Sequence, residues 1–96
     1  MIISETAAQA LKASVATRGK NKGLLLSKAP PSRSLAYAAW QAAMLCCNPF
    51  KASIAGILFM NEEQRAIYNE VLAIFEGLGI NSLDRDRNGL ERLGVW

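Results

Sequence analysis

The stretch from Leu35 to Met60 constrains the fold more than any other part of this 96-residue chain. It contains no acidic residue and one charged residue, Lys51. Asn48-Pro49 interrupts it near the middle, because a residue that precedes proline is disfavoured in a helix. Neither half reaches the roughly 20 apolar residues that a membrane-spanning helix needs. The pattern therefore predicts a buried helical hairpin, with helices over residues 35–47 and 50–60, and no membrane span.

The rest of the chain predicts a single helical domain over residues 1–96, since a chain this short has little material for a second core. We expect an all-α fold, a small compact bundle of about four helices with the apolar hairpin at its centre. A first helix is predicted from the Ser4 N-cap to about Arg18, where Gly19 ends it. A last helix is predicted from Asn61 to Glu76, and Gly77 or Gly79 ends it.

Local signals are strongest for the last helix. Asn61 is an N-cap, Gln64 has the spacing of a capping-box partner, and the first turn is acidic. Its apolar residues form a broad stripe that we expect to face inward: Ile67, Tyr68, Val71, Leu72, Ile74, Phe75 and Leu78. In the preceding segment, Ile54, Ile57 and Leu58 are also expected to face inward.

The predicted helix over residues 35–47 is apolar on two faces. One face holds Leu35, Ala38, Ala39, Ala42 and Leu45, and the other holds Tyr37, Trp40, Met44 and Cys47. A helix that is apolar all round is central in its fold or covered by a partner. A small bundle has difficulty burying both faces. We therefore predict that Tyr37, Trp40 and Met44 bind a partner, with ordinary core packing as the alternative.

Charge is distributed unevenly along the chain, whose net charge is +3. Residues 1–33 hold six basic residues and one acidic residue, whereas residues 61–96 hold four basic and seven acidic residues. The predicted flexible basic loop, residues 18–33, combines positive charge with glycine and contains no aromatic residue for base stacking. Its candidate phosphate-binding residues are Arg18, Lys20, Lys22, Lys28 and Arg33. The alternative is a solvated loop without a ligand.

A turn near the C-terminus resembles the first half of a calcium-binding loop of the EF-hand type. Asp84, Asp86 and Asn88 have the D-x-D-x-N spacing, followed by Gly89. The twelfth position of such a loop, where a bidentate carboxylate is required, is Val95. These three residues are therefore a weak metal candidate, and the alternative is a charged turn in which Asp and Arg side chains pair.

Most enzyme chemistry is excluded by the residue types present. The chain contains no histidine, so a Ser-His-Asp triad is absent. The two cysteines, Cys46 and Cys47, are adjacent, which disfavours a disulfide between them. The pair also lacks the ligand spacing of a zinc site. We predict no catalysis, no cofactor and a reducing, cytoplasmic environment.

These observations predict a non-enzymatic helical protein that docks on a protein or nucleoprotein partner. Its character suits a phage or mobile-element inhibitor or regulator of a host nucleic-acid-handling complex. The alternative is a nucleic-acid-binding protein that acts through the basic loop with little sequence specificity, and the third reading is a calcium-linked module. Homo-oligomerisation is compatible with each of these.

Overall fold

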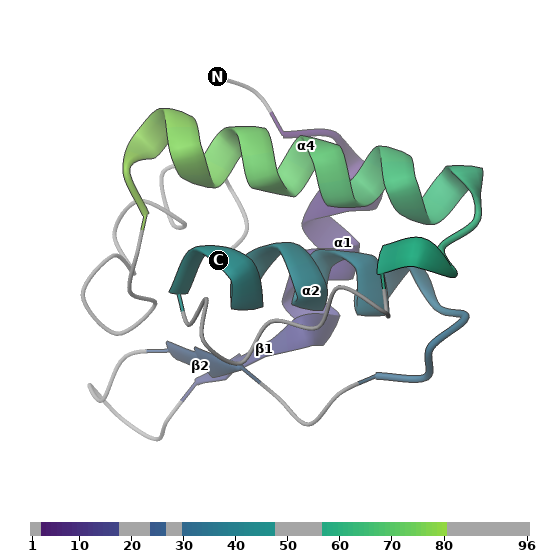
Figure 1. The fold of residues 1–96 in the computed structure, drawn as a ribbon. Coiled ribbons are helices and arrows are strands. Elements are labelled where there is room, and N and C mark those ends of the chain that lie inside the picture. The colour runs from purple at the N-terminus through teal and green to yellow at the C-terminus, as the bar shows by residue number, and fades with distance from the viewer. Residues whose placement is uncertain (1–2, 18–23, 27–29, 48–56, 81–96) are drawn as a thin grey trace.

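A computed structural model of the chain describes residues 3–17, 24–26, 30–47 and 57–80 (Figure 1). Its elements, in chain order, are α1 (Glu5–Ser14), β1 (Val15–Thr17), β2 (Leu24–Leu26), α2 (Leu35–Cys47) and α4 (Glu62–Leu78). α4 runs alongside α2, and α1 packs against α2 from behind. The predicted all-α class is confirmed for the body of the fold, which consists of helices. The predicted hairpin partner over residues 50–60 falls largely on residues 48–56, which lie outside the described residues.

α1 begins where the sequence predicts and ends earlier. The Ser4 hydroxyl accepts a hydrogen bond from the backbone N–H of Ala7 at 3.2 Å, as an N-cap does. The helix stops at Ser14, so the prediction that it continues to about Arg18 is wrong. Val15–Thr17 instead pairs antiparallel with Leu24–Leu26. The segment holds two β-branched residues, which favour an extended backbone, and its pairing partner lies too far along the chain for helical periodicity to reveal.

Part of the segment from residue 18 to residue 33, which includes the strand β2, has regular structure. Within the predicted basic loop, Leu24–Leu26 forms a strand, and a hydrogen-bonded turn precedes α2. In that turn the Ser34 N–H donates to the Pro31 carbonyl at 2.9 Å, and the Ser34 hydroxyl donates to the same carbonyl at 2.7 Å. Residues 18–23 and 27–29 lie outside the described residues.

α2 has the predicted bounds and is the central helix. The Ser34 hydroxyl accepts from the Tyr37 N–H at 3.2 Å and caps its first turn. α2 contacts both α1 and α4 more extensively than those two helices contact each other. The side chains that allow this close approach are small and fully buried: Ala38, Ala39, Ala42 and Ala43. Alanine at these positions brings the backbones of neighbouring helices close together.

α4 confirms the predicted local signals. The Asn61 side chain accepts from the Gln64 N–H at 2.8 Å, and the Gln64 side chain accepts from the Asn61 N–H at 3.1 Å, which completes a capping box. Gly79 ends the helix in the left-handed conformation, with φ of 69°. The predicted inward stripe is buried or half-buried except for Leu78, which is exposed, so that part of the prediction is wrong.

The core lies between the three helices, with Leu11, Val71 and Phe75 fully buried. A polar contact links the edges of two of them. The backbone N–H and the hydroxyl of Ser4 donate to the Glu70 carboxylate at 2.7 and 2.9 Å. The carboxylate from α4 therefore holds the first turn of α1 in place beside the core.

Candidate protein-binding surface

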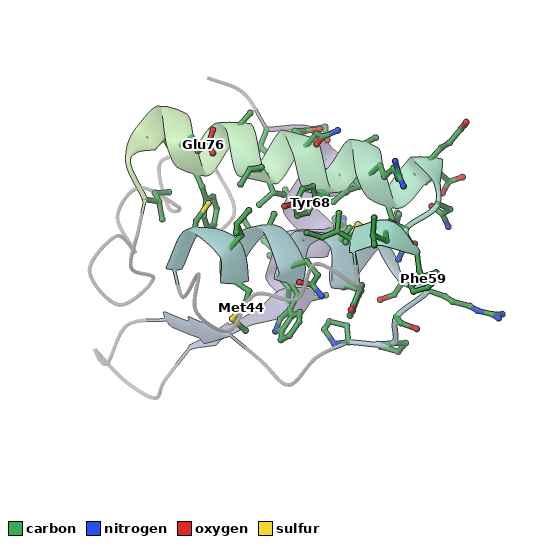
Figure 2. All side chains as sticks on the ribbon, viewed as in Figure 1. Met44, Phe59, Tyr68 and Glu76 are labelled. Atoms are coloured by element: carbon green, nitrogen blue, oxygen red, sulfur yellow. The ribbon has the colours of Figure 1, made fainter. Side chains whose placement is uncertain are left out.

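The three residues predicted to bind a partner lie together on α2. Tyr37, Trp40 and Met44, called here the aromatic face, are each half-buried. The rings of Tyr37 and Trp40 stack with their centroids 5.9 Å apart and their planes inclined by 25°. Figure 2 shows Met44 on the side of α2 that points away from α4. The spacing of three and four residues thus brings the three side chains to one side of the helix.

The two sides of α2 differ in how deeply their side chains are buried. The alanine side is fully buried against neighbouring helices, whereas the aromatic face retains surface that water can reach. No charged residue occurs anywhere in the 13 residues of α2. Half-exposed aromatic rings on an uncharged helix have the composition that protein interfaces favour.

Gln41 links the aromatic face to the interior. Its Nε2 donates to the Tyr37 hydroxyl at 2.8 Å, while its Oε1 is buried and has no hydrogen-bond partner. An unpaired buried acceptor costs on the order of 1–3 kcal/mol. The Tyr37 oxygen accepts from Gln41, so its own O–H remains a donor. Of the aromatic face, Tyr37 is also the residue that packs against the described core.

Cys46 lies on the same helix and is poorly suited to act as a nucleophile. Burial raises the pKa of the Cys46 thiol, and the carboxylate of Glu76 raises it further. Burial also raises the pKa of Tyr68, with added contributions from Cys46 and Glu76. A thiol whose pKa is raised stays protonated at neutral pH, and the protonated form is a weak nucleophile.

An open groove of about 430 Å³ runs between α1 and the start of α2. Leu35 and three alanines line most of it, together with Thr6 and Gln9, and Glu5 is the ionisable residue among the lining residues. One carboxylate on an open groove lacks a second acid or base with which to exchange a proton. The groove is therefore large enough for a small ligand, but its described lining residues include no pair of acid and base residues for catalysis.

The other predicted sites fall mainly outside the described residues. Arg33 is the described member of the phosphate-binding set, and it is exposed in the turn before α2. Arg18, Lys20, Lys22 and Lys28 lie in the segments that the structure leaves out, as do Asp84, Asp86 and Asn88. Within the described part of the chain, no group of three or more acidic, cysteine or histidine residues could hold a metal ion.

Two exposed apolar residues were missed by the sequence reasoning. Leu58 is 65% exposed, so its predicted inward orientation is wrong, and Phe59 is 86% exposed. Leu58 is helical and Phe59 lies in the turn that leads into α4, while Met60 beside them is buried. The available signal was the Asn61 N-cap, because it marks the start of a new helix and so places Leu58 and Phe59 outside that helix.

Comparison with protein-family models, curated protein sequences and solved structures finds no match to this chain. In the described ranges, every helix is too short or too polar to cross a bilayer.

Proposed function

We propose that this chain is a non-catalytic protein-binding module that docks through the aromatic face of α2. The observation that carries the proposal is the stacked, half-exposed pair of Tyr37 and Trp40 on an uncharged central helix. Trp and Tyr are enriched among the residues that dominate binding energy at interfaces. Met44 adds an adaptable thioether that fits irregular partner surfaces.

The partner class follows from the charge pattern. The first third of the chain has a net charge of +5, and Arg33 lies exposed in the turn just before α2. A partner that carries phosphates or acidic side chains would be attracted by this positive charge. We therefore extend the proposal to docking on a nucleoprotein complex, in the manner of a small phage or mobile-element inhibitor of a nucleic-acid-handling machine.

A second candidate is direct binding of nucleic acid through the basic segment, which the exposure of Arg33 favours. This reading makes a distinct prediction, because each neutralised phosphate makes binding depend steeply on salt. Retention on single- or double-stranded DNA should fall sharply between low and physiological salt. No retention at low salt contradicts this candidate and leaves the protein-binding proposal unaffected.

The test of the main proposal compares three baits in affinity capture from a cell lysate. The first bait is the wild-type chain, and the second carries W40A and M44A. Tyr37 is left intact because its hydroxyl pairs with the buried Gln41 amide. The third bait is a matched control with N69A, a change at an exposed position of α4.

We expect the wild-type and N69A baits to retain the same proteins and the W40A/M44A bait to lose them. Circular dichroism of all three baits checks that the helices are retained. Equal capture by all three baits would contradict a binding role for the aromatic face, as would the absence of any specifically captured protein.

A further inference from the structure

The segment that leads into α4, residues 57–60, carries a small apolar patch on the surface. Leu58 and Phe59 are 65% and 86% exposed, although Met60 next to them belongs to the core. The Met60 N–H donates to the Ile57 carbonyl at 3.2 Å, which gives the turn an internal hydrogen bond. Figure 2 shows Phe59 at the end of the molecule where α4 begins, away from Met44 on the aromatic face. The patch therefore lies apart from Met44.

A buried glutamine brings a basic residue to this end of the molecule. The Nε2 of Gln64 donates to the carbonyls of Ser32 and Ser34 at 2.8 and 2.9 Å. These two bonds fix the turn before α2 against the first turn of α4. Arg33 lies between the two tethered carbonyls and is exposed. Its positive charge consequently stands beside the N-terminus of α4.

Three further charges surround the same end. Glu62 and Glu63 are exposed in the first turn of α4. The Nε of Arg65 donates to the Met60 carbonyl at 3.3 Å, which brings its guanidinium group back towards the turn. With Arg33, the described residues at the rim of the apolar patch therefore include two positive and two negative side chains.

From this arrangement we infer that the surface around Phe59, called here the Phe59 end, binds a second copy of the same chain. In a twofold contact the same patch faces itself, so it must be self-complementary. An apolar centre with a rim of balanced charge meets this condition, because each arginine can face a glutamate of the other copy. A strongly acidic or basic partner would gain little from a rim whose charges cancel.

The size of the patch sets the strength of the contact. A buried phenyl ring removes about 150–250 Å² from water, so two Phe59 rings supply about 300–500 Å². Stable interfaces bury about 1,200–2,000 Å² in total, and the polar rim must provide the remainder. The self-association is therefore weak, with a dissociation constant in the range of about 10 μM to 1 mM.

Sedimentation velocity over a concentration series from about 10 μM to 2 mM tests the apolar centre. The wild-type chain is expected to shift from monomer to dimer, and F59S to weaken the dimer at least tenfold. The matched control is L78S, which removes an exposed leucine from the opposite end of α4. L78S and the W40A/M44A variant are expected to dimerise as the wild type does, which separates this inference from the proposed function.

Charge reversal tests the rim. R33E changes the net charge of these four described rim residues from zero to −2, and E62K changes it to +2. Each variant alone repels its own copy, so we expect its dimer to weaken about tenfold. An equal mixture of R33E and E62K, with one of them fluorescently labelled, is expected to form a mixed dimer at least as tight as the wild-type dimer.

The inference is overturned by a wild-type chain that stays monomeric at about 2 mM, the top of the series. A dimer that F59S leaves unchanged overturns it equally, and so does a mixture of the two charge variants that fails to associate. Circular dichroism confirms that each variant is folded before its association is compared.

Discussion

Replacing Gln64 by glutamate offers a sharp test of how this fold is held together. The side chain of Gln64 is 2% exposed and makes three hydrogen bonds. Its Oε1 accepts from the Asn61 N–H, and its Nε2 donates to the carbonyls of Ser32 and Ser34. Q64E keeps the acceptor that completes the capping box and removes both donors. The variant thus separates the helix cap from the tether to the turn before α2.

The magnitude follows from the bonds that are lost. Two hydrogen bonds contribute about 1 kcal/mol each, and a buried carboxylate that faces two carbonyl oxygens adds a desolvation penalty of about 1–2 kcal/mol. An acidic side chain in the first turn of a helix returns about 0.3–1 kcal/mol through the helix dipole. We expect Q64E to lower the free energy of unfolding by about 2–4 kcal/mol at neutral pH.

Urea denaturation followed by circular dichroism measures this difference. The matched control is N61A, which removes the N-cap and leaves the tether, with an expected loss of about 1 kcal/mol. If Q64E is as stable as the wild type or more stable, the tether contributes nothing and the reasoning is wrong. A loss in Q64E no larger than that in N61A would also contradict it.

Three further predictions concern the core, the end of α4 and the alkaline limit of stability. F75A should cost about 3–5 kcal/mol in urea denaturation, since Phe75 is fully buried. G79A should lower the free energy of unfolding by about 1–2 kcal/mol, because φ at Gly79 is +69°, a conformation that alanine disfavours. No atom of the described residues lies within 4 Å of an added Cβ, so a steric clash adds nothing to this cost. G79N should lose less, because asparagine tolerates that conformation better. The pKa of Cys46 and that of Tyr68 are raised in the folded state, so their stabilising contribution is complete below the unfolded-state values and declines as pH rises past about 9. C46A should flatten that decline in thermal melts recorded at increasing pH, and an unchanged pH profile would contradict the assignment.

The parts of the fold that the sequence predicts are those specified by neighbouring residues. Asn61, Gln64 and Gly79 lie at the ends of α4, and each acts on backbone groups within one turn. The bounds of α2 follow from Ser34 and from Pro49 in the same way. These signals are local, so a single sequence contains them in full.

The parts that the sequence does not predict depend on contacts between distant residues. The end of α1 is set by the pairing of Val15–Thr17 with Leu24–Leu26. Leu58 and Leu78 lie near the two ends of α4, where apolar spacing continues beyond the residues that pack against other helices. The contact between Ser4 and Glu70 is likewise invisible in sequence spacing.

In the aromatic face, too, some features follow from local sequence and others depend on contacts between distant residues. Helical spacing is sufficient to place Tyr37, Trp40 and Met44 on one side of α2. The degree to which that side is covered depends on the whole fold, and so does the exposure of Phe59. The Gln41 bond to Tyr37 follows an i, i+4 spacing, yet the burial of its unpaired oxygen depends on the helices packed around it.

The most direct test of the central claim is the affinity of a purified, captured partner for the W40A/M44A variant, measured by calorimetry at physiological salt. Interface residues that dominate binding contribute about 2 kcal/mol or more, which corresponds to a rise in dissociation constant of about 30-fold. We predict a rise of at least that size for W40A/M44A and a change within about twofold for N69A. A W40A/M44A variant that binds within about threefold of the wild type would contradict the claim that the aromatic face of α2 is the binding surface.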